Sequence, residues 1–414
     1  MWKLTYNLLS YAFLPFFAIY ALLNSKIRRN FLERIYLSTT RGEIRNGVWI
    51  HAASIGEAVI AETIINRLRQ RIGNDFIITT NTYYTRDMLR RKFKDAVRVF
   101  SLPFDLPFSI RHFIDRSRFS ALILVETEIW PNLIWIAKTK KIPVIIINGR
   151  ISDQTVGRYR CLSFFMRHVL SSVDLVLAQS EEHSQRFISL GMAPSKVVAT
   201  GNLKYYRDIK GLPDITSKDN AVTFGSIKEK ELPFLMPAIA ELKREFPELH
   251  VFVAPRELNL TTVIETQLPQ GLTYGRFSAL RSAGKTNCDV VIVDTVGDLI
   301  HIYARSKVAF VGGSLADYGG QNMLEPLFVG TPVLFGPYVD NFKAIAHDIM
   351  ERQAGFMVND THQLVSEIRR ILNSEALRKS LTEAGNLVVA TQRGAMENAS
   401  HLIEEIIWKN SQSS

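Results

Sequence analysis

Residues 121–126, ALILVE, form a short and almost continuous apolar run that ends on a carboxylate. Such a run is typical of a strand in a parallel sheet, which is buried on both faces. Similar runs flank it along the chain, and segments with apolar residues at helical spacing separate them. This alternation predicts a doubly wound α/β sheet. Its predicted strands are 48–52, 76–80, 97–100, 121–126, 143–147 and 173–178.

A second series of apolar runs follows in the other half of the chain. The segment 206–219, YRDIKGLPDITSKD, is polar and broken by Gly211 and Pro213, so we expect it to link two domains. Because ligands of such sheets bind beyond the carboxyl ends of the strands, we expect two Rossmann-like domains that face each other across a cleft. The second set of predicted strands is 221–225, 250–254, 290–294, 308–311 and 332–335.

Length and composition support this organisation. A chain of 414 residues is long enough for two domains, and an apolar fraction of 47% excludes intrinsic disorder. The two cysteines, Cys161 and Cys288, exclude a disulfide scaffold and a cysteine-rich metal site.

Charge is divided unevenly along the chain, whose net charge is +10. Residues 1–205 hold 29 basic and 15 acidic residues, a net of +14, whereas residues 206–414 hold 21 and 25, a net of −4. The asymmetry indicates two domains with different partners. A basic domain suits nucleic acid, phosphate or an anionic membrane, but no known nucleic-acid-binding motif is present.

The segment 4–23 is apolar, free of charged side chains and about as long as a membrane-spanning helix. Lys26, Arg28, Arg29 and Arg34 follow it, which by the positive-inside rule predicts an N-terminal anchor with the remaining chain in the cytoplasm. A cleaved signal peptide would carry its basic residues before the apolar run. The alternative is a helix that is buried in the domain or lies in the membrane interface.

Carboxylates follow two predicted strands of the first domain. Glu57, in the stretch HAASIGE at 51–57, lies at a helix start beyond the first strand, where it suits either proton acceptance from a hydroxyl or simple compensation of the helix dipole. Glu126 and Glu128 are two residues apart, so an extended segment directs both to one side, as expected for substrate contact; capping of the following helix is the alternative. Lys204, in GNLK, suits an anionic sugar or a leaving phosphate, or is a surface charge.

The second domain carries glycine-rich and polar turns after its strands. Gly225-Ser226 predicts a phosphate-binding turn that opens a helix. The segment 312–315, GGSL, and the segment 319–326, GGQNMLEP, offer backbone amides to phosphate, and Glu325 suits a ribose diol.

The motifs HAASIGE, VETEIWPN, GNLKY, APR, GGSL and GGQNMLEP occur in this order over nearly the whole chain. In this the chain resembles the 3-deoxy-D-manno-octulosonic acid (Kdo) transferases, membrane-associated glycosyltransferases of the GT-B fold. The resemblance implies inverting transfer of Kdo from CMP-Kdo to the lipid A precursor (lipid IVA), without a catalytic metal or other cofactor. It implies that Glu57 is the proton acceptor and that Glu128 and Lys204 stabilise the transition state. The implied CMP-binding residues are Ser226, Pro255, Arg256, Val296, Gly297, Asp298, Asn322, Met323, Leu324 and Glu325.

The expected organisation is therefore a membrane anchor with its basic flank at 1–36, an acceptor-binding domain at 37–205, a linker at 206–219 and a CMP-Kdo-binding domain with C-terminal helices at 220–414. The expected partners are CMP-Kdo, the lipid A precursor and anionic lipids of the inner membrane, with no role for nucleic acid. Two alternatives stay open: a GT-B transferase that uses another nucleotide sugar, and a membrane-tethered protein that binds sugar nucleotides without catalysis.

Overall fold

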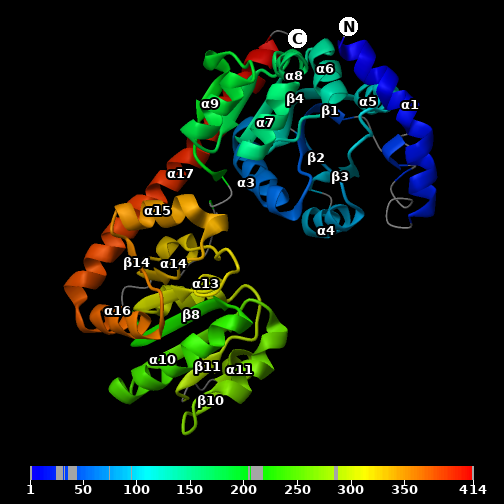
Figure 1. The fold of residues 1–414 in the computed structure, drawn as a ribbon. Coiled ribbons are helices and arrows are strands. Elements are labelled where there is room, and N and C mark those ends of the chain that lie inside the picture. The colour runs from blue at the N-terminus through cyan, green and yellow to red at the C-terminus, as the bar shows by residue number, and fades with distance from the viewer. Residues whose placement is uncertain are drawn as a thin grey trace. The chain divides into compact units, whose positions relative to one another are not determined.

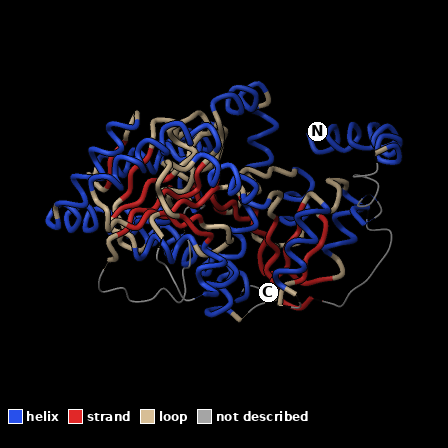
Figure 2. Tube along the Cα trace, turned by 90° about the horizontal axis from the view of Figure 1, so that it is seen from below, coloured by secondary structure: helices blue, strands red, loops and turns tan. Residues whose placement is uncertain are grey.

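The computed structural model describes residues 2–24, 31, 33–35, 44–73, 75–94, 96–203, 206, 218–283 and 288–412. The chain divides into two compact units: unit 1 is Met1–Asp208 with Gln392–Ser414, and unit 2 is Ile209–Thr391. Each unit is built on a seven-stranded parallel sheet (Figure 1), and helices lie outside the strands (Figure 2). The prediction of two Rossmann-like α/β domains is confirmed.

The sheet of unit 1 has the strand order β3-β2-β1-β4-β5-β6-β7. Its strands are β1 (Ile44–His51), β2 (Phe76–Thr80), β3 (Arg98–Ser101), β4 (Ser117–Val125), β5 (Val144–Gly149), β6 (Leu175–Ala178) and β7 (Val197–Ala199). The helices of unit 1 are α1 (Trp2–Leu23), α3 (Ile55–Ile72), α4 (Tyr83–Phe93), α5 (Pro107–Ile114), α6 (Pro131–Thr139), α7 (Asp153–Cys161), α8 (Ser163–Leu170) and α9 (Glu181–Ser189), and η1 (Pro194–Lys196) is a 3₁₀ turn.

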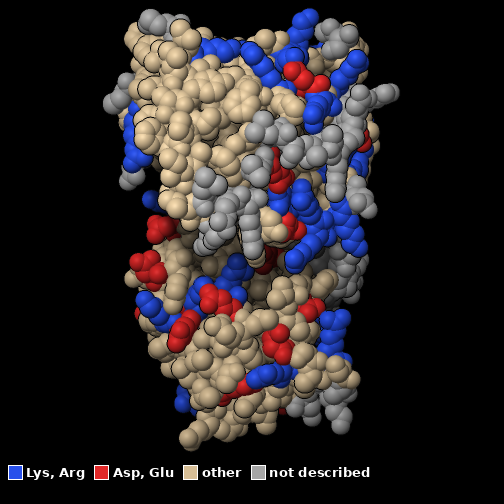
Figure 3. Space-filling view, turned by 90° about the vertical axis from the view of Figure 1, so that its right-hand side faces the viewer, with Lys and Arg blue, Asp and Glu red and all other residues tan. Residues whose placement is uncertain are grey.

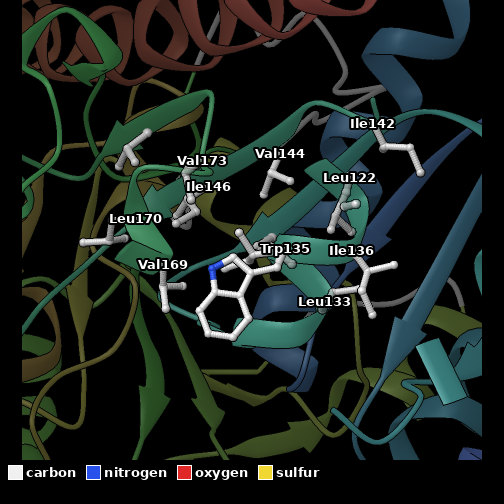
Figure 4. Packing of buried hydrophobic residues seen from close by; sticks show 14 of the residues in the cluster. Leu122, Leu133, Trp135, Ile136, Ile142, Val144, Ile146, Val169, Leu170 and Val173 are labelled. Carbon is white, nitrogen blue, oxygen red and sulfur yellow. The ribbon is translucent and has the colours of Figure 1, made fainter. Parts of the chain in front are cut away.

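Both faces of this sheet are packed. Within β4, Leu122 and Leu124 belong to one hydrophobic cluster, and Ala121, Ile123 and Val125 belong to another, because successive side chains of a strand point to opposite faces. In the first cluster the indole of Trp135, from α6, lies among aliphatic side chains of β4, β5 and α8 (Figure 4). Burial on both faces explains why the sequence shows unbroken apolar runs here rather than alternation.

The sheet of unit 2 has the strand order β10-β11-β9-β8-β12-β13-β14. Its strands are β8 (Ala221–Ile227), β9 (His250–Pro255), β10 (Tyr274–Arg276), β11 (Val290–Ile292), β12 (Val308–Val311), β13 (Val333–Phe335) and β14 (Gly355–Met357). The helices are α10 (Leu232–Glu245), α11 (Thr261–Gln267), α12 (Phe277–Ala283), α13 (Leu299–Arg305), α14 (Leu324–Phe328), α15 (Lys343–Glu351), α16 (Thr361–Asn373) and α17 (Glu375–Gln412), with 3₁₀ turns η3 (Glu229–Glu231), η4 (Leu258–Leu260) and η5 (Asp340–Phe342).

All eleven predicted strands are present, and the described residues contain three further strands that were not predicted. The additional strands are β7, β10 and β14, each of three residues, and each lies at an edge of its sheet. An edge strand is paired on one side only and is partly exposed, as the mixed burial of all three shows. They therefore lack the continuous apolar run that marks the central strands.

The last helix departs from the predicted domain boundaries. The prediction placed all of 220–414 in the second domain, whereas Gln392–Ser414, the end of α17, belongs to unit 1. Met396, Ala399, Ile403 and Ile407 recur at helical spacing and are buried in the core of unit 1, which gives the physical reason. Of the predicted linker 206–219, residues 207–217 lie outside the described residues.

Helix α1 coincides with the predicted membrane anchor. Across the described residues, no helix combines the length and the apolarity that crossing a bilayer requires, so the spanning anchor predicted at 4–23 is not supported. The mean hydropathy of α1 is reduced by its polar side chains, among them Asn7 and Ser10, and by four tyrosine or proline residues. Lys26, Arg28 and Arg29 of the predicted basic flank lie outside the described residues.

The orientation of α1 is the reverse of that in an ordinary surface helix. Its partly buried positions include Lys3, Tyr6, Asn7 and Ser10, whereas Leu8 is 62% exposed and Phe16 is 71% exposed. The helix thus directs polar side chains inward and apolar side chains outward. Figure 3, which views the molecule from the side where α1 lies in Figure 1, shows a broad area without charged side chains in its upper part.

Candidate active site

Polar side chains of unit 1 meet at the carboxyl edge of its sheet. His51 is the last residue of β1, Asn81 directly follows β2, and Glu126 directly follows β4. The strand order places β1 between β2 and β4, and all three are parallel. Segments separated by more than 70 residues in the sequence are therefore brought to one edge, where ligands of such sheets bind.

Glu57 occupies the first turn of α3 and is 7% exposed. Its Oε1 accepts a hydrogen bond from Ser54 Oγ at 2.7 Å, its Oε2 accepts one from the amide of Ala53 at 2.7 Å, and its own amide donates to Ser54 Oγ. Ser54 is thus the N-cap of α3, and Glu57 supports the cap by accepting from the Ser54 hydroxyl and from the amide of Ala53. The capping interpretation and the catalytic one are therefore compatible.

The electrostatic setting of Glu57 is unusual for a capping residue. Burial raises its pKa to about 7, against the lowering effect of the hydrogen bonds from Ser54 and Ala53, and the carboxylates of Glu126 and Glu128 raise it further. A carboxyl group with a pKa near neutrality exchanges a proton readily at physiological pH, as a general base must.

The Glu128 carboxylate contacts polar groups from three segments. Its Oε2 lies 3.0 Å from Trp130 Nε1, 3.4 Å from Asn81 Nδ2 and 3.4 Å from His51 Nε2. Burial raises the pKa of Glu128, but its interactions with His51, together with the hydrogen bonds from Trp130 and Asn81, outweigh burial and lower it. Glu128 is therefore a fixed negative charge beside the titrating Glu57.

Glu126 does not have the predicted extended backbone. Its φ is +61°, in the left-handed region that residues other than glycine rarely adopt. The prediction that an extended segment directs Glu126 and Glu128 to one side was therefore wrong in its geometry, because the chain turns sharply where β4 ends. Both carboxylates nevertheless raise the pKa of Glu57, so both lie near it.

The third predicted catalytic residue of this half, Lys204, lies outside the described residues. Its role stays a prediction. Within unit 1, the described residues thus bring together two of the three predicted catalytic side chains, with His51, Asn81 and Trp130 around them.

In unit 2, the turn at Gly225-Ser226 is not the helix start that the sequence suggested. Both residues lie within β8, and η3 separates this strand from α10. A Cβ atom on Gly225 would lie 1.8 Å from the hydroxyl of Tyr303, so the glycine is required by packing. Ser226, with a φ of +59°, occupies an irregularity in the pairing of β8 with β9, which sets its side chain apart from the regular strand.

The GGSL turn after β12 was predicted to offer its amides to phosphate, and the structure contradicts this. The carboxylate of Glu231 accepts hydrogen bonds from the amides of Gly313 at 2.7 Å, Ser314 at 3.0 Å and Leu315 at 3.0 Å. Glu231 is fully buried. An anion does bind this ring of amides, but the anion belongs to the protein itself.

Pro255 and Arg256 mark the end of β9. The amide of Arg256 donates to the carbonyl of Ile227 at 2.9 Å, which fixes the backbone beside Ser226, and the Arg256 side chain is exposed. The neighbouring Glu257 pairs with Lys228 at 2.5 Å. Because Glu257 pairs with Lys228, the guanidinium of Arg256 lies at the surface without forming an ion pair with its neighbour Glu257.

The segment Val296-Gly297-Asp298 precedes α13 and is open to solvent. Val296 is 86% exposed, and Gly297 has a φ of +98° with open space around it. Asp298 accepts a hydrogen bond from Arg281 at 3.1 Å. An exposed apolar side chain on an open turn suits contact with a flat ring, such as a nucleotide base.

The last predicted segment, Asn322 to Glu325, opens α14. Asn322 Oδ1 accepts from the amide of Leu324 at 3.2 Å, and Asn322 Nδ2 lies 3.5 Å from Glu325 Oε1. Met323 and Leu324 are almost completely buried, so the structure does not expose them to a ligand. Asn322 and Glu325 are the members of this segment with partly exposed side chains.

Two residues of the unit 1 site and one of unit 2 were not assigned a role from the sequence. His51 contacts Thr79 in the neighbouring strand, and its Nε2 also reaches Glu128. Asn81 and Glu231 carry no motif that would mark them. Their only sequence signal is position: Asn81 follows a strand that neighbours β1, and Glu231 begins a helix. No group of three or more potential metal ligands occurs among the described residues.

Comparison with known proteins agrees with this geometry. A protein-family model described as 3-deoxy-D-manno-octulosonic-acid transferase (kdotransferase) matches residues 28–207. A 3-deoxy-D-manno-octulosonic acid transferase of Haemophilus influenzae is 29% identical over 426 residues, covering 99% of this chain and 100% of that protein. A bifunctional glycosyltransferase/methyltransferase of Fusobacterium nucleatum is 32% identical over 79% of this chain, which spans about half of that relative (53%).

Among solved structures, a UDP-GlcNAc 2-epimerase of Neisseria meningitidis bound to UDP-GlcNAc matches with a TM-score of 0.57. The match covers 88% of this chain and 100% of the epimerase, at 13% identity. At this identity the likeness concerns the fold alone, which is the GT-B arrangement of two Rossmann-like units.

Proposed function

Because this chain is similar to Kdo transferases, we propose that it belongs to their family and moves Kdo from CMP-Kdo to the lipid A precursor with inversion at the anomeric carbon. The observation that carries the proposal is the pair of carboxylates in unit 1. Glu57 is buried, with a pKa of about 7, and the pKa of the neighbouring Glu128 is lowered by its interactions with His51, Trp130 and Asn81. One titrating and one fixed carboxylate at a sheet edge are suited to proton removal beside a developing positive charge.

The reaction is a single displacement. Glu57 accepts the proton of the acceptor hydroxyl, and the hydroxyl oxygen forms a bond to the anomeric carbon of Kdo. The bond from that carbon to the CMP phosphate oxygen breaks, and CMP leaves with the electron pair. The negative charge of Glu128 stabilises the positive charge that develops on the sugar, and Lys204 is assigned to the anionic groups of the substrates.

Unit 2 is assigned to the donor. Arg256 offers an exposed guanidinium for the phosphate, and Ser226 offers a hydroxyl on the adjoining strand. Asn322 and Glu325 present partly exposed polar groups suited to the ribose, and Val296 offers exposed apolar surface to the base. Pro255 is buried and directly precedes Arg256 in the assigned set. Gly297 and Asp298, in the open turn before α13, and the buried Met323 and Leu324, which lie between Asn322 and Glu325, complete the assigned set.

The test is transfer by the purified full chain. The protein is incubated with CMP-Kdo and lipid IVA, and the product mass reports both transfer and the number of Kdo residues added. Glu57→Gln is expected to lower kcat by about a thousandfold, as loss of a general base does, with CMP binding unchanged. Glu62→Gln, on the same helix and paired with Lys92, is the matched control and is expected to keep full activity.

Competition separates the alternatives. CMP is expected to inhibit Kdo transfer, and UDP is not. Inhibition by UDP and not by CMP would indicate that the protein uses another nucleotide sugar as its donor. Near-normal turnover in Glu57→Gln would show that Glu57 is not the general base. CMP binding without any transfer by the wild-type protein would favour the non-catalytic alternative.

We also propose that α1 lies in the headgroup region of the inner membrane, with the catalytic units on the cytoplasmic side. The exposed apolar side chains of Leu8, Phe13, Phe16 and Ile19 support this, because an outward apolar face is costly in water. The net charge of +14 on residues 1–205 favours anionic lipids.

Vesicle flotation tests this attachment. The full chain is expected to float with vesicles that contain phosphatidylglycerol, less with phosphatidylcholine alone, and Phe13→Glu with Phe16→Glu is expected to abolish flotation. The control Phe164→Glu changes an equally exposed phenylalanine of α8. Equal flotation of all variants would exclude attachment through α1.

A further inference from the structure

Helix α6 begins directly after the loop that carries Glu128, but it has no cap of its own. Its N-cap residue, Trp130, makes no capping hydrogen bond through its side chain, and Pro131 occupies the first turn. The amides of the next two residues, Asn132 and Leu133, therefore need an acceptor from elsewhere.

Asp105, in the loop between β3 and α5, is that acceptor. Its Oδ2 accepts from the amide of Asn132 at 3.1 Å, and its Oδ1 accepts from the amide of Leu133 at 2.9 Å. The Asn132 side chain donates back to the carbonyl of Asp105 at 2.7 Å. Three hydrogen bonds thus fix the start of α6, and the loop from Glu128 to Trp130 is held between this point and the end of β4.

Helix α1 completes the arrangement through a single residue. The hydroxyl of Tyr6 donates to Asp105 Oδ2 at 2.8 Å, across 99 residues of sequence. The ring of Tyr6 lies edge-on to Trp135 of α6, with centroids 6.0 Å apart, and 5.7 Å from Phe165 of α8. Burial and the Asp105 carboxylate raise the pKa of Tyr6, so its phenol stays protonated and remains a donor.

We infer that Asp105 is a positioning residue for the catalytic loop, and that α1, through Tyr6, is coupled to the placement of Glu128. With α1 seated, Asp105 is held by three donors from two helices. When α1 moves away, Asp105 loses the hydrogen bond from the Tyr6 hydroxyl, and the capping of α6 by Asp105 becomes weaker. Trp130, the N-cap residue of α6, then no longer holds Glu128 in one position. The inference rests on the proposed role of Glu128 and adds that α1 serves turnover as well as attachment.

Tyr6→Phe tests the coupling, because it removes the hydroxyl and keeps the ring packed on Trp135. Tyr11→Phe is the matched control on the same helix, since Tyr11 also stacks on a phenylalanine, Phe108. Both variants are made in the full chain. Hydrogen exchange of the peptide spanning 126–134 is measured first, because this readout does not depend on the assigned reaction.

Tyr6→Phe is expected to exchange faster than Tyr11→Phe in this peptide and to lower kcat about tenfold, with the KM for CMP-Kdo unchanged. Asp105→Asn, which places an amide NH₂ against a backbone N–H, is expected to show both effects more strongly. If Asp105→Asn does not fold, the two tyrosine variants decide the question alone.

Two results would overturn the inference. Unchanged exchange in Tyr6→Phe would show that α1 does not stabilise the loop. Faster exchange with unchanged kcat, in a preparation whose wild type is active, would show that the loop is stabilised without consequence for catalysis. A wild type that lacks Kdo transfer contradicts the proposed function instead, and the exchange measurement still tests the contact.

Discussion

The carboxylate of Glu231 and the amide of Gly313 lie 2.7 Å apart, although 82 residues separate them in the sequence. Because the same carboxylate also accepts from Ser314 and Leu315, it joins the start of α10 to the turn that follows β12. A glycine-rich turn in this position resembles a phosphate-binding loop in sequence, and here it is closed by an internal anion.

Replacement of Glu231 by Gln is expected to destabilise the protein. The amide NH₂ of glutamine would face one or more backbone N–H groups that now share a carboxylate, and a buried donor without an acceptor costs about 1–3 kcal/mol. Denaturant unfolding followed by circular dichroism measures the loss. Glu229→Gln, an exposed change in the same 3₁₀ turn, is the control and is expected to leave the free energy of unfolding unchanged. Equal stability of the two variants would contradict the assigned role.

The activity is expected to rise with pH through about pH 7. Burial raises the pKa of Glu57 to about this value, and only the deprotonated carboxylate accepts the acceptor's proton. A profile of kcat against pH between 5 and 9 measures the midpoint. A midpoint near 4.5, the ordinary value for glutamate, would show that Glu57 is not the titrating base.

Stability is expected to change in the opposite direction. The folded protein keeps the Glu57 proton up to about pH 7, whereas the unfolded chain releases it near pH 4.5, so the folded state binds more protons between these values. The contribution of Glu57 to the free energy of unfolding is therefore fully present below pH 4.5 and falls as the pH rises to about 7. Glu57→Gln is expected to remove this slope, and Glu62→Gln is expected to keep it.

Trp130→Phe is expected to lower kcat about tenfold while the KM for CMP-Kdo stays constant. The change removes the indole N–H that lies 3.0 Å from Glu128, so this carboxylate loses its shortest hydrogen bond and its pKa rises. Steady-state kinetics on the purified protein measure the effect. Trp408→Phe, at an exposed position of α17, is the control; a similar loss in both variants would point to a general effect of removing tryptophan.

Gly394→Ala is expected to stabilise the protein by about 0.5–1 kcal/mol, because Gly394 lies inside α17 with open space where a Cβ would stand. Gly385 is in the same helix, but a Cβ there would lie 2.9 Å from Leu327 Cδ2. Gly385→Ala is therefore expected to gain less, or to lose stability. Thermal unfolding compares the two, and an equal gain in both would contradict the packing at Leu327.

The sequence predicted the central strands and the catalytic carboxylates because both depend on local pattern. β4 and β5 are unbroken apolar runs, and Glu57 and Glu128 lie shortly after the ends of β1 and β4. It could not predict contacts between segments distant in the sequence. The hydrogen bond from Asn81 to Glu128 depends on strand order, which the apolar pattern does not encode.

Two errors have the same physical origin. The end of α17 was assigned to unit 2 because helical periodicity shows that a segment has a buried face but not which core covers it. The GGSL turn was interpreted as open because a turn sequence does not show which group occupies its amides. Glu231 carries no signal that distinguishes it from Glu229, two residues earlier, whose side chain is exposed.

The path of α17 has a consequence for the order in which the protein matures. Met396, Ala399, Ile403 and Ile407 are part of the core that also contains Val48 and Ile50, yet the ribosome adds them more than 340 residues later. Arg67 and Arg71 likewise cannot form their ion pairs with Glu397 until that residue has been synthesised. The amino-terminal unit therefore cannot complete its core until synthesis has passed Ile407, and unit 2 is the first to have its whole sequence available. Deletion of residues 396–407 near the carboxyl end would therefore remove part of the core of the amino-terminal unit.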